Sequence, residues 1–445
     1  MISENITAIS TALGASGVAV IRISGDSPLE IAKKMFVPLE KINVGDFEPN
    51  KLYVGEILAD DFKDFGMCVY FKAPKSFTGE DTIEFHSHGG TAITRGILKN
   101  ILSLGARLAG NGEFTKRAFM NGKLSLASCE GLIDMINSES VSGVKAGYSL
   151  YREKLTKKTE NLQNRITEVL SQLDVEVDFP EENLERTSLE VVENTLSQVN
   201  AELTDLLATF KTGRVVKNGV KVAIVGKPNT GKSSLLNALL CYDKAIVSDI
   251  PGTTRDIVEG AVDINGVRFN FSDTAGIRES SDKIEEIGVD MSKRTVNESH
   301  LVVFVLDGGD VDENDEKIYQ LVKDKNILVV VNKTDKGDYE DQRADIYVSA
   351  KTGDNLDKLR NLIFERTVGE GVDMNGELLM EERHYEALSR AREKFEFALS
   401  NVNNVPLDIL AIDIKDGWDA LGEISGKTAT EEIINDIFSR FCVGK

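Results

Sequence analysis

The motif GKPNTGKS, at residues 226–233, has the residue types and spacing of a loop that binds phosphate groups. Gly226 and Gly231 let main-chain N–H groups close around phosphate oxygens, and the Lys232 ammonium suits the β and γ oxygens of a nucleotide. The Ser233 hydroxyl can ligate Mg²⁺, and the helical run that follows directs its positive N-terminal end toward the phosphates. The predicted residues of this loop are Asn229, Thr230, Gly231, Lys232, Ser233 and Ser234.

Two later motifs have the residues that complete a metal and phosphate site. In DTAG, at 273–276, Asp273 offers a carboxylate behind the Mg²⁺ ligands, and the Gly276 N–H can sense a γ-phosphate. PGTTRD, at 251–256, lies between the two motifs, where a switch segment is expected. Thr254 is the candidate Mg²⁺ ligand of that switch. The predicted contacts here are Thr253, Thr254, Asp273, Thr274, Ala275 and Gly276.

The base of the nucleotide is predicted to bind at NKTD, residues 332–335. The Asp335 carboxylate can accept hydrogen bonds from both N1–H and the N2 amine of guanine, and adenine lacks that pair of donors. The sequence therefore predicts GTP rather than ATP. SAK, which follows the next strand, can support the base through main-chain N–H groups. The predicted residues are Asn332, Lys333, Thr334, Asp335, Ser349, Ala350 and Lys351.

The group that promotes hydrolysis is less evident from these motifs. Ras-like enzymes place a glutamine directly after DTAG, but this chain has Ile277 there, which cannot orient a water molecule. The chemistry of the residues leaves five candidates, which are Arg255, Glu279, Asp282, Glu285 and Glu286.

Five strand-like runs, each followed by a loop and then by helical spacing, carry these motifs at their carboxyl ends. The alternation predicts a doubly wound, mainly parallel sheet of the Ras-like P-loop type. The runs are 220–226, 268–276, 300–309, 327–335 and 345–353.

The segments on either side of this sheet have other patterns. Residues 1–118 are predicted to be mixed α/β, whereas residues 119–213 and the segment from about 377 have helical spacing. A capping box from Thr428 to Glu431 predicts the start of the last helix. The pattern leaves open one helical domain interrupted by the α/β module, or two separate helical domains.

Composition narrows the class of protein. A chain of 445 residues suggests about three domains, and no run of apolar residues is long enough for a membrane span. The N-terminus has no signal-peptide or transit-peptide pattern, and the single, scattered cysteines suggest a reducing cytoplasm. A net charge of −21 opposes broad, non-specific binding to nucleic acid but leaves room for a local basic patch.

The whole chain closely resembles the MnmE (TrmE) family of tRNA-modification GTPases. The resemblance rests on FTGED, HGG, GEFTKRAF, the nucleotide motifs and the terminal Cys-apolar-Gly-Lys. It implies a folate-binding and dimerising α/β domain at 1–118, a helical domain at 119–213 and 371–445, and an inserted G domain at 214–370. It also implies a homodimer that works with the flavoprotein MnmG, which carries the FAD. Together they would modify C5 of uridine 34 in certain tRNAs, with a 5-formyl- or methylene-tetrahydrofolate as one-carbon donor.

The resemblance also implies roles for individual residues. A K⁺ ion that activates GTP hydrolysis would be bound by Asn229 and by Ser248, Ile250 and Thr253 of the loop from Ser248 to Thr253, which also contains Asp249, Pro251 and Gly252. Glu285 aligns with the family's water-positioning glutamate. The implied folate-binding residues are Arg22, Glu84, Lys123 and Lys445.

Cys442 lies in the tail FCVGK, where we expect Phe441 to anchor the chain and Gly444 to let it turn. Attack of the Cys442 thiolate on C6 of the uridine is chemically reasonable, and the flavoprotein could supply the nucleophile instead. Two alternative functions compete with tRNA modification. One is a switch GTPase of ribosome assembly, and the other is a folate-binding scaffold with a vestigial G domain.

Overall fold

The computed structural model describes residues 4–178, 189–242, 260–273, 294–337, 340–369 and 378–444, without the side chains of Cys241, Tyr242 and Asp273. Its close contacts divide the chain into two compact units. One comprises 1–133, 150–196 and 393–445, and the other comprises 134–149 and 197–392. Several predicted site residues lie outside the described residues: Ser248, Asp249, Ile250, Pro251, Gly252, Thr253, Thr254, Thr274, Ala275, Gly276, Glu285 and Lys445.

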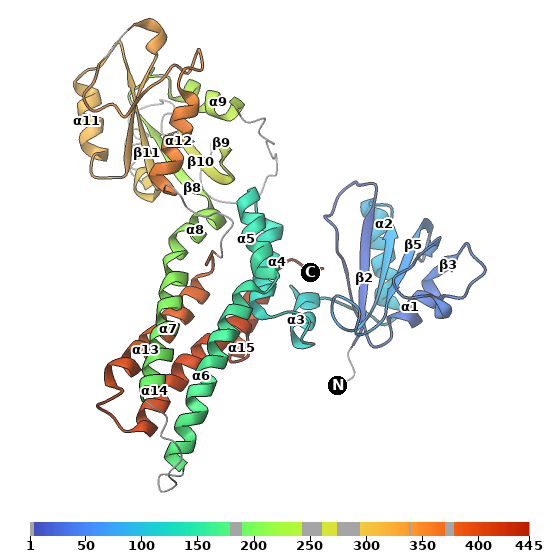
Figure 1. Cartoon of the computed structure of the whole chain (residues 1–445). Helices are drawn as coiled ribbons and strands as arrows, with labels where there is room; N and C mark the ends of the chain where they lie inside the picture. The colour runs from blue at the N-terminus through green and yellow to red at the C-terminus, as the bar shows by residue number, and fades with distance from the viewer. Residues whose placement is uncertain are drawn as a thin grey trace. The chain divides into compact units, whose positions relative to one another are not determined.

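A seven-stranded sheet forms the N-terminal part of the chain, with the order β3-β4-β5-β6-β2-β1-β7 (Figure 1). All neighbours are antiparallel except β1 and β7. The strands are β1 (Ile6–Ile9), β2 (Ala19–Gly25), β3 (Phe36–Pro38), β4 (Leu52–Leu58), β5 (Lys63–Phe71), β6 (Asp81–Ser87) and β7 (Arg107–Leu108). The other elements are α1 (Pro28–Met35), η1 (Val44–Asp46), α2 (Thr91–Ser103) and α3 (Glu113–Met120).

The two faces of this sheet differ in chemistry because side chains alternate along each strand. Ile21 and Ile23 of β2 are fully buried in the core that includes residues of α1 and α2. Arg22, between them, points to the opposite face. On that face Leu52 and Val54 of β4 are 49% and 42% exposed. The sheet thus buries one apolar face and leaves apolar and charged side chains on the other.

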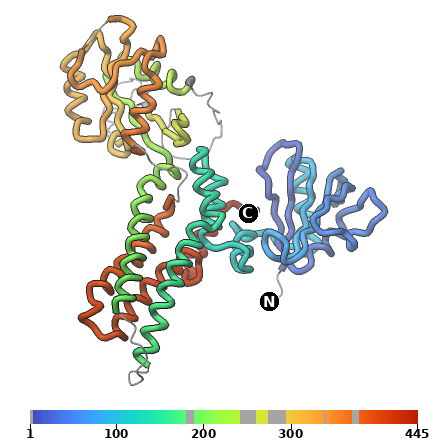
Figure 2. Tube along the Cα trace, in the orientation of Figure 1, coloured from blue at the N-terminus to red at the C-terminus, as the bar shows by residue number. Residues whose placement is uncertain are grey.

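Helices from both sides of the G domain pack together. α6 (Lys154–Asp178) buries one stripe of apolar side chains, and Gln163 on that helix donates to the Trp418 carbonyl at 3.0 Å. Trp418 belongs to α14 (Leu407–Ser425) and donates its indole N–H to Thr167 at 2.9 Å. The tube in Figure 2 shows these two distant segments side by side. This packing favours a single interrupted helical domain, although the four predicted boundaries remain predictions.

The remaining helices of this region are α4 (Leu126–Asn137), α5 (Val141–Tyr151), α7 (Leu189–Ala208), α8 (Phe210–Asn218), α13 (Glu382–Asn401) and α15 (Glu431–Ser439). The predicted capping box at the start of α15 is wrong. The Thr428 hydroxyl donates to the Asp419 carbonyl at 2.7 Å, and Thr430 is the N-cap that accepts from the Ile433 N–H. The helix begins at Glu431, so Thr430 is the residue directly before it, and Thr428 lies too early in the chain to cap it.

The G domain has a six-stranded sheet with the order β13-β12-β11-β8-β10-β9, parallel except for the β9–β10 pair. The strands are β8 (Val220–Val225), β9 (Gly260–Ile264), β10 (Val267–Asp273), β11 (Leu301–Asp307), β12 (Ile327–Asn332) and β13 (Ile346–Tyr347). The other elements are α9 (Lys232–Tyr242), α11 (Glu313–Val322), η2 (Thr334–Lys336) and α12 (Leu356–Thr367). The predicted mainly parallel, doubly wound sheet is confirmed.

Candidate functional sites

The phosphate-binding loop connects β8 to α9. Gly231 has φ +90°, and a Cβ there would lie 2.4 Å from the Asn332 amide nitrogen, so both conformation and space favour glycine. Lys232 is buried, and its Nζ donates to the carbonyl oxygens of Gly226 and Lys227 at 2.8 Å. The predicted phosphate-binding cation therefore lies within the loop, and Ser233 and Ser234 follow it in the first turn of α9.

The base-binding motifs meet the phosphate-binding loop at the carboxyl ends of the strands. The Asn332 side chain donates to the Thr230 carbonyl at 3.0 Å and accepts from the Ala350 N–H at 3.1 Å. One amide thus connects three of the predicted motifs. Ser349 donates to Asp335 at 2.8 Å and so holds the carboxylate that is predicted to read guanine.

Lys333 makes two contacts that sequence reasoning did not predict. Its Nζ donates to the Asn229 carbonyl at 2.5 Å and to the Asp307 carboxylate at 2.7 Å. Burial favours the neutral acid, but the hydrogen bonds from Lys333 and the Gly309 N–H and the nearby lysine charges together outweigh it and lower the pKa of Asp307. The signal for Asp307 was its place at the end of β11, beside the strand that carries the loop.

Lys227 is a second buried lysine of the loop that sequence reasoning left without a role. Its Nζ forms ion pairs with Asp310, Asp312 and Asp315 at 3.1–3.2 Å. Asp312 and Asp315 form the capping box of α11, so their positions are fixed by that helix. Lys227 therefore anchors the outer turn of the loop to the start of α11.

In the N-terminal sheet, the structure brings together two of the four residues predicted to bind folate. Arg22 of β2 and Glu84 of β6 are directly opposite in the strand register and form an ion pair at 2.7 Å. The guanidinium carbon lies 5.6 Å from the ring centres of both Phe77 and Phe114. This pair is thus partly enclosed by two aromatic rings.

The second oxygen of Glu84 faces His86, at 3.4 Å from its Nε2. Burial opposes ionisation of Glu84, but the hydrogen bond from His86 and the charge of Arg22 together lower its pKa. The carboxylate is therefore ionised at neutral pH. This contact places His86 beside the predicted site.

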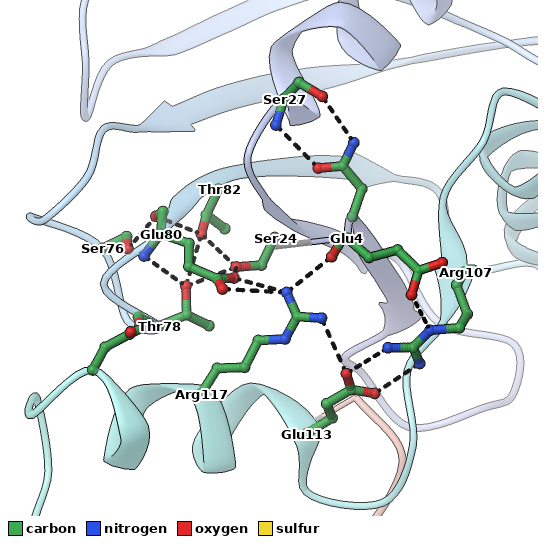
Figure 3. Close-up of polar contacts among 12 residues, drawn as sticks. Glu4, Ser24, Ser27, Ser76, Thr78, Glu80, Thr82, Arg107, Glu113 and Arg117 are labelled. Carbon is green, nitrogen blue, oxygen red and sulfur yellow. Dashed lines mark hydrogen bonds and ion pairs between the residues drawn. The ribbon is translucent and has the colours of Figure 1, made fainter. Parts of the chain in front are cut away.

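A network of polar side chains fixes the loop and helix that carry the two aromatic rings (Figure 3). Arg117 of α3 bonds Glu80 at 3.0 Å and Glu113 at 3.1 Å. Glu80 also accepts from the Ser24 hydroxyl at 2.8 Å, and Arg107 bonds Glu113 at 2.7 Å. FTGED and GEFTKRAF, which carry the resemblance, are thus joined to each other and to β2.

The C-terminal tail is held against this domain. Phe441 is buried, and the Gly112 N–H donates to the Cys442 carbonyl at 3.4 Å. Gly444 has φ +100°, and a Cβ there would lie 2.4 Å from the Ile9 carbonyl oxygen at the end of β1. The expected anchor and turn are confirmed, and the Cys442 side chain is exposed.

Lys123 is the third of the predicted folate-binding residues that the structure describes. It donates to the Pro74 carbonyl at 3.0 Å, in the loop that leads to Phe77. Strand β1 lies between the tail and the ion pair. Ala8 of β1 is the register partner of Arg22, and the next residue, Ile9, contacts Gly444 of the tail. The tail and the ion pair therefore occupy the same part of the sheet.

Comparison with known proteins identifies relatives over the whole chain. A family model described as "MnmE helical domain" matches residues 126–442, and one described as "GTP-binding protein TrmE N-terminus" matches residues 5–123. The protein named tRNA modification GTPase MnmE from Acetivibrio thermocellus is 38% identical, with 99% of each chain covered. The one from Desulforamulus reducens is 39% identical, with 100% of each chain covered.

Among solved structures, Aquifex aeolicus Era bound to GDP and AlF4⁻ is 32% identical over 39% of this chain and 66% of that chain, with a TM-score of 0.28.

In the parts of the chain that the structure describes, every helix is too short or too polar to cross a membrane.

Proposed function

The chain belongs to the MnmE family of tRNA modification GTPases, and we propose that it uses K⁺-activated GTP hydrolysis to drive modification of C5 of wobble uridine 34. It is a GTP hydrolase that acts in tRNA modification and uses GTP and Mg²⁺. The proposed partner is the flavoprotein MnmG, and the proposed one-carbon donor is a tetrahydrofolate. A cytoplasmic location remains a prediction from the scattered cysteines.

The position of the C-terminal tail is the observation that carries this proposal. Gly444 packs on the end of β1, whose Ala8 is the register partner of Arg22. A thiol-bearing tail held near a paired arginine and carboxylate suits a reaction between a substrate and a polar cofactor. A switch GTPase has no need for such a tail.

The residues at the ion pair fit a folate by their chemistry. A pterin has adjacent donors and acceptors on one edge, which a carboxylate such as Glu84 can bind, and its glutamate tail carries carboxylates for Arg or Lys. Arg22, Glu84, Lys123 and Lys445 are proposed to bind it, and the folate when bound supplies the one-carbon unit. Cys442 is proposed to act on the tRNA side, where its exposed thiol is available.

The proposed cation and hydrolysis residues lie mostly outside the described part of the chain. The donor set for K⁺ consists of main-chain and amide oxygens, which are hard ligands of the kind such a cation takes. Asn229 has φ +67°, and its carbonyl is held by Lys333. Bound K⁺ would neutralise charge on the phosphates, and Glu285 would position the attacking water.

A homodimer is proposed through the open face of the N-terminal sheet. Leu52, Val54 and Phe65 lie on that face, and each is more than 40% exposed. Apolar side chains gathered on one face are typical of a surface that a partner covers. The same face carries Arg22 and Glu84.

The test of the proposal is the nucleoside composition of tRNA from cells that carry a deletion of the last four residues. Wobble-uridine modification should be lost, while GTP hydrolysis by the purified variant stays within about twofold of the full chain. A Cys442→Ser variant that still modifies tRNA would assign the nucleophile to the partner. A normal nucleoside profile after complete deletion of the gene would instead favour the ribosome-assembly switch.

Cation dependence is measured separately. GTP turnover should be much faster in KCl than in NaCl at equal ionic strength, and Glu285→Ala should keep GTP binding while losing most hydrolysis. Equal rates in the two salts would remove K⁺ from the proposal.

A further inference from the structure

We propose that six cationic side chains beside the N-terminal site form a docking surface for the phosphate backbone of the RNA substrate. This inference rests on the proposed function, because it places the RNA that carries the uridine. The cationic patch consists of Lys72, Lys75, Lys123, Arg152, Lys154 and Lys157, all of them exposed.

The patch is contiguous although its members come from three segments. Lys123 donates to the Pro74 carbonyl at 3.0 Å, which places it against the loop that carries Lys72 and Lys75. Two residues later, the Ser125 hydroxyl lies 3.1 Å from the Thr156 hydroxyl on the first turn of α6. Lys154 lies two residues before Thr156, and Lys157 directly follows it. Two direct contacts thus join the loop, the segment before α4 and the start of α6.

Charge balance leaves the patch with a local positive charge. None of its six cations forms an ion pair with a residue that the structure describes. By contrast, Arg22 and Arg117 of the same compact unit are both bound to carboxylates. Residues 150–158 hold four basic side chains and one acidic side chain, Glu153, in a chain with a net charge of −21. A local positive surface on an acidic protein suits a polyanion.

Two acids close in sequence to patch residues make contacts with other groups. Asp81, at the base of the loop, accepts the Ala73 N–H at 2.8 Å. Glu160, one turn further along α6, pairs with Lys427 at 2.8 Å. Between Arg152 and Lys157, Glu153 is therefore the one acidic residue.

The patch lies where the flanking phosphates of the reacting uridine are needed. Its loop continues to Phe77, whose ring centre is 5.6 Å from the Arg22 guanidinium carbon. An RNA whose single-stranded loop delivers a base to the Arg22–Glu84 pair would bring its backbone across the neighbouring cations. Phosphate contacts of this kind fix the register of an RNA without reading its sequence. We therefore assign the patch a positioning role and no base recognition.

The experiment is a binding titration of a fluorescent, unmodified tRNA transcript with uridine at the wobble position, using the full chain at several KCl concentrations. The test variant is Arg152→Gln, Lys154→Gln and Lys157→Gln combined, which spares the proposed folate ligand Lys123. Affinity at low salt should fall about 10- to 100-fold, and the slope of log K against log salt should become shallower by about 2 to 3, one for each lost phosphate contact. GTP turnover should stay unchanged.

The matched control removes three exposed lysines of the G domain, in Lys317→Gln, Lys323→Gln and Lys325→Gln combined. An equal loss of affinity in this control would show that only net charge matters and would overturn the proposal. Unchanged tRNA binding in the test variant would overturn it too, and so would loss of binding to the flavoprotein with tRNA affinity retained. Lys154→Arg with Lys157→Arg keeps the charge and should bind normally, which separates charge from folding. If tail truncation abolishes modification while the test variant binds tRNA normally, the proposed function stands and the patch fails.

Discussion

Two cations at the two sites, Lys232 and Arg22, are held in different ways. The Lys232 ammonium is bonded to two carbonyl oxygens of its own loop, within six residues along the chain. The Arg22 guanidinium is bonded to a carboxylate 62 residues away on another strand. Main-chain carbonyls carry only partial charges, whereas Glu84 carries a full one. A ligand at Arg22 therefore meets a neutral pair, whereas the two carbonyls at Lys232 do not themselves cancel the charge of its ammonium.

This difference indicates which ligands each site can take. A neutral ion pair that is partly enclosed by aromatic rings favours a ligand with both hydrogen-bond donors and an acceptor group. A simple anion would have to displace Glu84 from Arg22. The main-chain dipoles of the phosphate-binding loop favour a polyanion. The two sites should therefore respond independently to mutation.

The largest effect should come from Lys232→Ala. The variant removes a buried positive charge from the loop and one hydrogen bond from each of the Gly226 and Lys227 carbonyls, so GTP affinity should fall at least 100-fold (~3 kcal/mol). A fluorescent GTP analogue measures the loss, and calorimetry with 5-formyltetrahydrofolate should show unchanged folate binding. Lys358→Ala, on the exposed face of α12, is the control and should bind GTP normally. A parallel loss of folate binding would contradict the independence of the two sites.

A smaller effect is expected from Arg22→Gln and from Glu84→Gln. Glu84→Gln removes the carboxylate that pairs with Arg22, and Arg22→Gln leaves Glu84 with only His86 beside it, at side chains that are 13–21% exposed. Folate affinity should fall about 30-fold (~2 kcal/mol) in either variant, with GTP turnover within twofold of wild type. Lys33→Gln is the matched control, because it breaks the more exposed Glu30–Lys33 pair of the same domain. If Glu84→Gln strengthened folate binding, Arg22 alone would be the ligand and the neutral-pair interpretation would be wrong.

The same contrast explains how much of each site was predictable from sequence. Gly231, Lys232 and Ser233 lie within one short loop, so their spacing alone specifies their geometry. Arg22 and Glu84 meet only because β2 and β6 pair in one register, and no local pattern in the sequence encodes that register. They were named only from the resemblance to a family.

Two local features of the fold show other limits. The strand β9 was not predicted, although Asn265–Gly266 between apolar residues is a strong hairpin signal, and both residues have positive φ. Near the start of α15, Thr428 has the glutamate of a capping box three residues later, whereas Thr430 is followed by Ile433 at that spacing. The motif predicts Thr428, but the helix begins at Glu431 and Thr430 is its N-cap, while the Thr428 hydroxyl donates to α14.

A third prediction concerns Lys227, the other buried lysine of the phosphate-binding loop. Lys227→Gln should weaken GTP binding about 5- to 10-fold, because Asp315 is fully buried and would lose its cation beside an incoming polyanion. The measurement is the same fluorescent titration, combined with the melting temperature of the full chain. Lys227→Arg should restore most of the affinity. Asp310→Asn, at a side chain 74% exposed, is the control and should change little. GTP affinity that stays unchanged in Lys227→Gln would contradict this role of Lys227.

The smallest effect should come from Glu113→Gln, in the network that supports the Arg22 site. Burial raises the pKa of Glu113, but hydrogen bonds from Arg107, the Gly110 N–H and Arg117 outweigh it and lower the pKa to about 2, from an ordinary value of 4.5. A lowered pKa in the folded state means that the stabilisation is complete above about pH 4.5 and is lost as pH falls toward 2. Because Arg107 is 44% exposed, solvent screening limits the contribution to about 1–2 kcal/mol at pH 7.

Hydrogen exchange of α3 amides, compared between wild type and Glu113→Gln at each pH, measures this contribution locally in the intact chain. The variant should exchange faster than wild type at pH 7, and the ratio should shrink as the pH falls below 4.5. Glu30→Gln, in an exposed pair of the same domain, should show no such trend. A ratio that stays constant down to pH 3 would mean that Glu113 acts through its shape and not through its charge. In that case the helix beside Arg22 would be held in place by packing and not by ion pairs.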